Sequence, residues 1–334
     1  MRRRFLLACS NNGPTNELIL TYKVTSTSTE TLLISNQSEV TVQNITYPTW
    51  DISQLKKMYI DDVEYTPKRT HKFSSTGTHT VRLIFNDTFN TMGMMFATCS
   101  NLVSADFTKC DLSNVTIMGG AFGDCTSLTS VNFNGVNTSN VTTMMGMFDT
   151  CTSLTSVDLS PLDTSNVTDF AYMFNACSAL TSIDLSTFNT TKLTDMYKMF
   201  TGCSSLVTAN LSSFVTSKVT DMSYLFQNCS KLQTVDMRNI GSTAITSTGR
   251  YQYMLSGCLA LTTLYWGMKT APSVYSNTFG NNSSTYTGYT NRRRGTNKLY
   301  LPTGHSGYTS LSFSNYWRSR LQSTSYCGFT VATY

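Results

Sequence analysis

The chain has 334 residues, of which 40% are apolar and 13% are charged, with a net charge of +5. These values suit a folded, soluble protein of two or three domains. No apolar run approaches the length needed to cross a bilayer, so no membrane insertion is expected.

Residues 1–16 are expected to form an N-terminal arm. Leu6-Leu7-Ala8-Cys9 is similar to a lipoprotein cleavage signal. The apolar run from Phe5 to Ala8 has four residues, however, whereas an export signal needs about 7–15. We therefore expect an ordinary cytosolic start.

Residues 17–88 are predicted to form a small β-sandwich domain. Segments 17–24, 41–47, 57–60 and 79–85 are rich in β-branched and aromatic residues, which favour strands. The stretch 74–81 is similar to the closing hairpin of immunoglobulin-like modules. We expect this Ig-like sandwich to pack against the following segment as its N-terminal cap.

Residues 89–266 contain a repeat of 26 residues, which predicts a solenoid of about seven coils. Phenylalanine and leucine columns keep the same step as a column of cysteines, which comprises Cys99, Cys125, Cys151, Cys177, Cys203, Cys229 and, after 29 residues, Cys258. One such unit buries too little apolar surface to fold alone, so the copies are expected to stack.

Within each unit the spacing predicts a short strand, a polar arc and one helical turn. Met196, Met199, Phe200 and Cys203 stand at i, i+3, i+4 and i+7, the spacing of one helix face. Asp195 precedes this turn, where a carboxylate can cap free N–H groups. The fold class predicted is therefore an α/β repeat, with a strand and a short helical turn in every coil.

The repeat resembles the BspA-like leucine-rich-repeat surface proteins. The pattern Phe-x-x-Cys-x-x-Leu-x-x-Val-Asp-Leu-Ser runs from Phe148 to Ser160 and is followed by Thr-Ser-Asn-Val-Thr-Asp and Met-Phe. The resemblance covers over half the chain and implies a leucine-rich-repeat solenoid. Since such repeats occur in bacterial adhesins, protozoan surface proteins and bacteriophage virion proteins, it implies an attachment or assembly role and brings no catalytic residue.

A polar column beside the buried strand residues is a candidate binding surface. It contains Asp158, Asp184 and Asp236, which we take as candidate glycan- or protein-binding residues on the concave side. The alternative is a solvated face whose short side chains hydrogen-bond along the stack. One carboxylate per coil does not supply the six to eight oxygens of a calcium site.

The cysteine column is expected to consist of buried free thiols. Neighbouring copies would lie close enough for disulfides, but each cysteine stands beside Met and Phe and no Cys-x-x-Cys pair occurs. Free thiols favour a protein completed in a reducing cytosol.

Residues 267–334 are predicted to form a basic, tyrosine-rich C-terminal cap. They hold seven Lys or Arg, eight Tyr and no Asp or Glu, which favours an anionic partner. The candidate residues for binding an anionic glycan or a neighbouring protein are Tyr286, Tyr289, Arg292, Arg293 and Arg294. The alternative is a terminal cap with a solvated basic loop.

No enzymatic activity is expected. The three histidines, His71, His79 and His305, have no metal-ligand spacing, and the chain lacks a phosphate-binding loop, a nucleophile elbow and a dinucleotide fingerprint. Accordingly, we expect no catalytic residue, cofactor, bound metal or small-molecule substrate. No nucleic-acid-binding motif accompanies the basic segment, so nucleic acid is not an expected partner.

Two non-enzymatic functions are consistent with these features. The preferred one is a bacteriophage virion protein, a fibre, tail or capsid-decoration component made in the host cytoplasm. The alternative is a bacterial cell-surface adhesin that binds glycan or host protein. Either would act as a homo-oligomer or as part of a larger assembly, with other virion proteins or a host-surface glycan or protein as partners.

Overall fold

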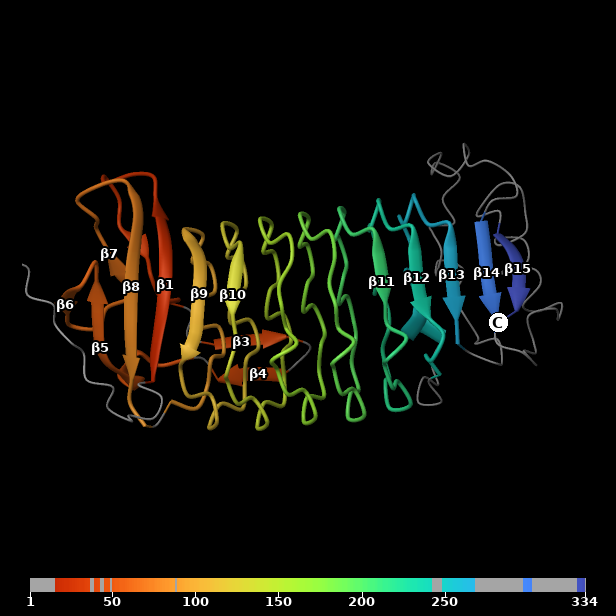
Figure 1. Cartoon of the computed structure of the whole chain (residues 1–334), viewed down its shortest axis with the longest axis horizontal. Helices are drawn as coiled ribbons and strands as arrows, with labels where there is room; N and C mark the ends of the chain where they lie inside the picture. Colours follow the sequence, from red (N-terminus) through yellow and green to blue (C-terminus); the bar gives the residue numbers. More distant parts are fainter. Residues whose placement is uncertain are drawn as a thin grey trace, which may run out of the picture.

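The computed structural model describes residues 16–36, 39–42, 45–48, 50–87, 89–241, 248–267, 297–301 and 329–333. They form one elongated body, with an N-terminal unit at one end and a row of stacked coils extending from it (Figure 1). In the predicted repeat segment, each coil is followed by the next along a single axis.

The N-terminal unit is built on a six-stranded sheet that also includes the first two coils. Its order is β10-β9-β1-β8-β5-β6. The strands are β1 (Glu17–Val24), β5 (Leu55–Ile60), β6 (Val63–Tyr65), β8 (Gly77–Phe85), β9 (Leu102–Lys109) and β10 (Ser130–Asn132). Strand β1 pairs antiparallel with both β8 and β9, whereas β10 is parallel to β9. The repeat therefore begins as a direct extension of the N-terminal sheet.

Two smaller ribbons complete this unit. Strand β2 (Thr31–Leu32) pairs with β7 (Thr70–His71), and β3 (Glu39–Val42) pairs with β4 (Ile45–Pro48). A short 3₁₀ turn, η1 (Ile52–Gln54), begins at Asp51, whose side chain accepts a hydrogen bond from Ser53 N. The predicted strands 17–24, 57–60 and 79–85 lie in β1, β5 and β8, whereas the predicted strand 41–47 falls across two paired strands, β3 and β4. The predicted Ig-like sandwich is not a separate unit in the described residues, because β1 uses its second edge to pair with the first coil.

Alternation of apolar residues explains why β1 forms the centre of this sheet. Leu18, Leu20 and Tyr22 are fully buried, and the Tyr22 hydroxyl donates to Leu33 O at 2.5 Å. Apolar residues at every second position place their side chains on one side of a strand. The N-terminal unit thus covers the end of the stack with its own apolar layer.

Parallel strands recur at the far end of the stack. They are β11 (Thr208–Asn210), β12 (Thr234–Met237), β13 (Thr263–Trp266), β14 (Asn297–Leu301) and β15 (Phe329–Thr333), hydrogen-bonded in this order. A second 3₁₀ turn, η2 (Thr248–Tyr251), lies before β13. Strands β14 and β15 come from the predicted C-terminal cap and continue the same parallel ladder.

The predicted α/β class is wrong, because the segment expected to be a helical turn is a series of tight turns. Met199 N donates to Met196 O and Cys203 N to Phe200 O, three residues back. Every second amide donates to the next coil instead, as Lys198 N does to Ser223 O and Phe200 N to Leu225 O. An α-helix would bond each amide to the carbonyl four residues earlier.

Left-handed backbone conformations separate these turns from a helix. Lys198 has φ of 56° and Gly202 has φ of 75°, and corresponding residues of the other coils share positive values. A right-handed helix cannot contain such residues. The four apolar residues with helical spacing, Met196, Met199, Phe200 and Cys203, are nevertheless all buried. The tight turns direct these side chains into the core, as one face of a helix would.

Two columns of side chains fill the centre of the stack. Phe122, Phe148, Phe174 and Phe200 stack with centroid distances of 5.5–5.6 Å and interplanar angles of 5–8°. The thiol of each following cysteine donates to a phenylalanine carbonyl of the preceding coil, as Cys177 Sγ does to Phe148 O at 3.0 Å. Burial raises the pKa of Cys177 to about 12, and the eight described cysteines are free and buried.

Buried threonines hold the polar arcs together. Thr138 Oγ1 donates to Asp163 O at 3.1 Å and accepts from Asp163 N at 2.8 Å. Thr164 and Thr190 repeat this two-way contact with the following coils. Each hydroxyl therefore satisfies one donor and one acceptor of the neighbouring backbone, which is what a buried polar group requires.

Candidate interaction surfaces

The stack has an exposed strand face, which carries the predicted aspartate column. Asp158 and Asp184 are exposed, and Asp236 is half-buried. Each uses one carboxylate oxygen to accept the backbone N–H two residues later, as Asp158 Oδ1 does from Ser160 N at 2.9 Å. The hydrogen bonds from Ser160 lower the pKa of Asp158. These carboxylates thus close the turn that follows each strand, and their binding role stays a prediction.

The strand face becomes aromatic and basic near its C-terminal end. The guanidinium of Arg238 lies 4.7 Å from the Tyr265 ring centre and forms an ion pair with Asp236. Tyr265 in turn stacks on Tyr300 at 4.4 Å, which gives Tyr300 a structural contact within the ladder. The other predicted residues of this segment, Tyr286, Tyr289, Arg292, Arg293 and Arg294, lie outside the described residues.

A second surface, here called the turn face, is formed by the tight turns at 91–99, 117–125, 143–151, 169–177, 195–203, 221–229 and 249–258. Thr91, Ile117, Thr143, Asp169, Asp195 and Asp221 occupy equivalent positions in successive coils and are joined by parallel β-bridges. The three carboxylates each accept a backbone N–H two residues later, at 2.7–2.8 Å. Three carboxyl groups are thereby fixed one coil apart.

The carboxyl group of Asp195 has a strongly raised pKa. Burial raises its pKa to about 7, and the flanking charges of Asp169 and Asp221 add to the shift. The hydrogen bond from Tyr197 N and the charge of Arg250 act in the opposite direction without cancelling it. Arg250 lies closest to Asp221, with which it forms an ion pair. The central carboxyl of the column therefore titrates near neutral pH.

Tyrosines stand beside these carboxylates on the last four coils of the turn face. The tyrosine row comprises Tyr172, Tyr197, Tyr224 and Tyr253, all half-buried, with successive ring centres 5.2, 5.6 and 5.0 Å apart. Lys198 Nζ lies 5.3–5.4 Å from the centres of the first three rings. An ammonium held over three aromatic faces is stabilised electrostatically, so its position is fixed by the row.

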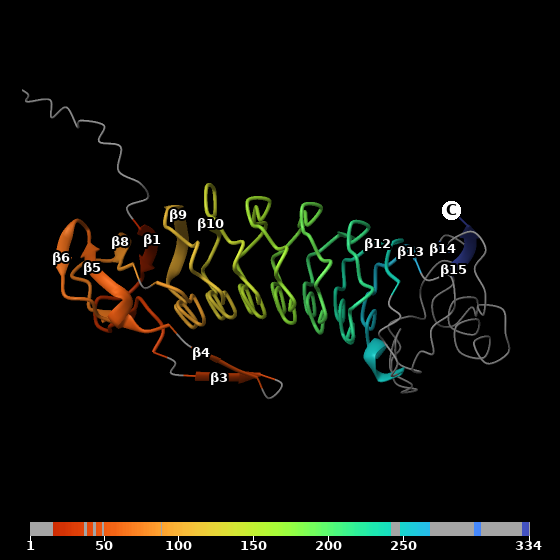
Figure 2. The same cartoon turned by 90° about the horizontal axis from the view of Figure 1, so that it is seen from below.

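The turn face of the earlier coils differs in composition and in surroundings. Gly120 and Gly146 take the positions that Tyr172, Lys198 and Tyr224 take later. Met145 of the third turn is buried with Ala171 of the fourth in a small apolar cluster, against which Ile117, Tyr172 and Tyr197 pack. The β3–β4 ribbon extends from the N-terminal unit along this side of the stack, as Figures 1 and 2 both show. Its base is fixed by hydrogen bonds from Ser35 N to Met95 O and from Trp50 N to Gly93 O.

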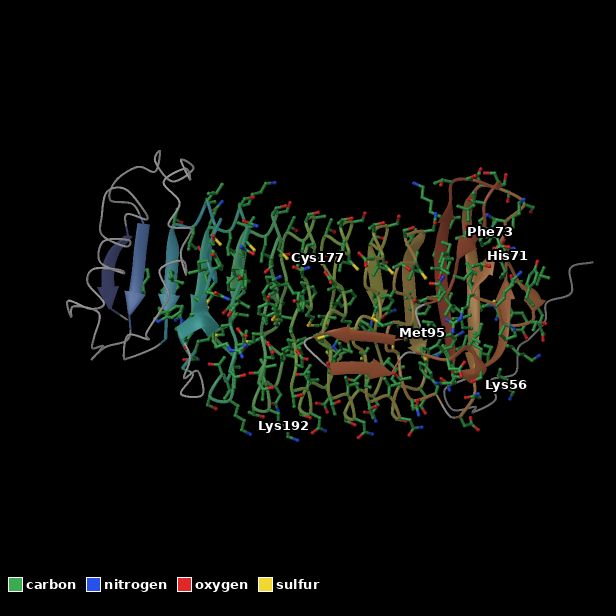
Figure 3. The ribbon with its side chains drawn as sticks, turned by 180° about the vertical axis from the view of Figure 1, so that it is seen from behind. Lys56, His71, Phe73, Met95, Cys177 and Lys192 are labelled. Atoms are coloured by element: carbon green, nitrogen blue, oxygen red, sulfur yellow. The ribbon has the colours of Figure 1, made fainter. Side chains whose placement is uncertain are left out.

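Figure 3 views the stack from behind, with the ribbon in front of the coils. Cys177 lies within the body of the stack, and Lys192 projects from the edge formed by the polar arcs, where its Nζ donates to Asn166 Oδ1 at 2.5 Å.

His71 and Phe73 belong to the N-terminal unit, where their rings meet edge to face with centres 4.6 Å apart. His71 and His79 thus pack in that unit, away from the turn-face carboxylates.

The described residues contain no group of three or more His, Cys, Asp or Glu side chains arranged to hold a metal ion. In the same ranges, no helix is both long enough and apolar enough to span a membrane.

Reasoning from the sequence missed the tyrosine row, although a signal was present. Aligning the repeats shows that Gly120 and Gly146 give way to Tyr172, Lys198 and Tyr224 at one position. Under the helical interpretation this position belongs to a solvated helix side. In the tight turns, Tyr172 and Tyr224 at this position instead lie next to Tyr197, which precedes the equivalent residue of its own coil by one. The aromatic rings of successive coils therefore gather on one surface.

The chain matches the model of one protein family in four overlapping segments, residues 27–129, 90–183, 121–239 and 153–266. No curated protein and no solved structure matches it. The overlapping segments cover well over half of the chain and follow its internal repeat. The chain therefore belongs to the family described as Mycoplasma protein of unknown function, DUF285.

Proposed function

We propose that this protein is a non-enzymatic attachment protein that presents a rigid stack of coils to a surface glycan or protein. The observation that carries the proposal is the polar, repeating exposed surface of the stack, in which each strand-face aspartate is held in place by a backbone N–H. Surfaces that repeat along a solenoid are extended and suited to binding.

The preferred setting is a bacteriophage virion, as a fibre, tail or capsid-decoration component. The BspA-like repeat pattern supports it, since such repeats occur in virion proteins. The free, buried thiols of the stack also support it, because proteins completed in a reducing cytosol keep their cysteines free.

A bacterial cell-surface adhesin is the second candidate. The family description, which names Mycoplasma, favours a bacterial protein. The BspA-like resemblance is compatible with both settings, because it includes bacterial adhesins.

Locating the native protein distinguishes the two settings. An antibody against the full chain is applied to purified phage particles from the producing strain and to intact cells, and neighbouring genes are read from the genome. Labelling of particles, with capsid, portal or tail genes nearby, is expected. Labelling of intact cells, with secretion or cell-wall genes nearby, would replace the virion by the adhesin, and hydrolysis of a glycan panel by the purified protein would reject both.

A further inference from the structure

We propose that the tyrosine row and its neighbouring carboxylates bind an extended, uncharged polysaccharide that lies parallel to the stack axis. This inference rests on the proposed attachment function and names its site and ligand class. It does not involve the candidate binding residues of the C-terminal segment, which lie outside the described residues.

The tyrosine rings are arranged differently from the phenylalanine rings of the core. Both columns have centroid distances near one coil step, but the phenylalanines are nearly parallel, at 5–8°. Tyr172 and Tyr197 are inclined by 70° and Tyr197 and Tyr224 by 75°, whereas the last pair, Tyr224 and Tyr253, is stacked at 24°. In an edge-to-face pair, one ring keeps a face that its neighbour does not cover. Lys198 Nζ already lies over the first three rings, so the C–H face of a sugar would stack on the part of these half-exposed rings that the ammonium leaves open.

The polar groups beside the rings match the hydroxyl groups of a sugar. Asp195 holds one carboxylate oxygen in its turn, at 2.7 Å from Tyr197 N, which orients the second oxygen as an acceptor. Lys198 supplies an ammonium donor at a position fixed by three rings. Because these groups are ordered before a ligand arrives, little conformational entropy is lost on binding.

Charges of both signs line the site. Asp169, Asp195 and Asp221 lie in one column, Arg250 pairs with Asp221, and Lys198 adds a second cation over the rings. With carboxylates and cations nearly balanced, a polyanion or a polycation gains little net attraction and still loses the hydration of its own charges. A neutral chain, whose hydroxyl groups both donate and accept hydrogen bonds, suits such a mixture.

The period and direction of the surface favour an elongated ligand. Parallel coils advance by ~4.8 Å, and a pyranose ring in an extended polysaccharide advances by a similar length, so about one sugar would face each coil. The β3–β4 ribbon lies beside the earlier coils and runs roughly along the stack axis (Figure 2).

The test measures binding of the full chain by calorimetry. The probes are β-1,4-linked glucose and N-acetylglucosamine oligomers of two to six sugars, oligogalacturonate as the anionic probe and oligolysine as a cationic peptide. We expect the affinity for a neutral oligomer to rise up to about four sugars, one for each coil of the row, and the anionic probe to bind more weakly.

The variant Y197S/Y224S should lower the affinity for that oligomer by roughly tenfold or more, since each substitution removes an aromatic contact face. The variant K198Q, which leaves the rings in place, should weaken binding less. The matched control is Y59S in the N-terminal unit, where Arg82 and Lys57 lie 4.6 and 5.9 Å from the Tyr59 ring. The thermal unfolding of each variant verifies that it folds.

The remaining outcomes separate this inference from the proposed function. Neutral oligomers that bind Y197S/Y224S as well as wild type would overturn the site and leave attachment intact. Wild-type protein that binds host cells, but binds no oligomer or only oligolysine, would overturn the ligand class. Protein that binds neither glycans nor cells would overturn the attachment function together with this inference.

Discussion

At the scale of single residues, the stack is held by polar side chains that bond the backbone of the next coil. Thr164 shows the pattern, because its hydroxyl donates to Asn189 O and accepts from Asn189 N, at 3.2 and 2.8 Å. Since the side chain is buried, neither backbone group has water as a substitute. The threonine in each arc is thus a structural requirement of a stacked coil.

Replacing this hydroxyl by a methyl group tests the requirement. Thr164→Val keeps the shape but leaves two backbone groups of the next coil without partners, and should lower the free energy of unfolding by about 1–3 kcal/mol. Urea denaturation provides the measurement. Thr168→Val is the control, because Thr168 is exposed and its hydroxyl makes one bond, to Thr142 O, which water can replace. Equal losses in both variants would contradict the argument.

A second prediction concerns the carboxyl of Asp195. Its folded-state pKa of about 7 lies above the ordinary value of 3.8, so the folded protein binds this proton more tightly. The contribution of Asp195 to stability is therefore complete below about pH 4 and decreases as the pH rises through 7.

Asp195→Asn keeps an oxygen for Tyr197 N and removes the buried charge. Relative to wild type, it should stabilise the protein by roughly 1–3 kcal/mol at pH 8 and by little or nothing at pH 4. Thermal unfolding between pH 4 and 8 measures the difference. Asp158→Asn serves as control, because the pKa of that exposed carboxyl is lowered by the Ser160 hydrogen bonds and the dependence on pH should reverse.

At the scale of the element, one tight turn per coil replaces the predicted helical turn. Its shape depends on left-handed residues, and these differ in how closely the neighbouring coil approaches them. A Cβ on Gly146 (φ 60°) would meet its nearest atom at 3.8 Å, whereas one on Gly257 (φ 80°) would lie 3.0 Å from Asn228 Cα. Comparing substitutions at Gly146 and Gly257 therefore separates the destabilisation caused by left-handed backbone strain from the destabilisation caused by a clash with the neighbouring coil.

Alanine substitutions at these glycines should therefore differ. Gly146→Ala carries only the left-handed strain of about 1–2 kcal/mol, whereas Gly257→Ala must also move the coil next to it and should be clearly more destabilising. The measurement is the thermal unfolding midpoint of each variant relative to wild type, and the decrease should be larger for Gly257→Ala. A similar decrease in both would show that coil contact is unimportant at Gly257.

At the scale of the whole molecule, the N-terminal unit and the stack share one sheet. Strand β1 covers the free edge of β9, and Phe85 stacks on Phe89 at 4.1 Å across the join. An uncovered parallel edge would offer its backbone groups to another chain. The N-terminal unit thus has the role of a terminal cap, as repeat arrays require.

Removing residues 1–88 tests this role. The shortened chain should form soluble aggregates or precipitate, because the edge of β9 and the buried side of its first coil become exposed. Light scattering coupled to size-exclusion chromatography gives the measurement, with the full chain as reference. A monodisperse, folded product would show that the stack needs no cover at this end.

Much of the stack follows from the sequence alone. The 26-residue step identifies which residues are equivalent, so the buried Phe and Cys columns and the existence of stacking could be predicted from position. The free, buried state of Cys177 was also predictable, because it stands among apolar neighbours. These features depend on side-chain pattern, which is local information.

The turn conformation and the surfaces depend on tertiary structure. The spacing of Met196, Met199, Phe200 and Cys203 is compatible with a helix, and only the carbonyls of the next coil explain why alternate amides turn outward to form bonds between coils. The joining of β1 to β9 and the gathering of the tyrosines likewise bring together groups from different coils. The sequence by itself determined the period and the core. Only the stacked neighbours decided the backbone conformation and the surface, because they supply the hydrogen-bond partners that one coil lacks.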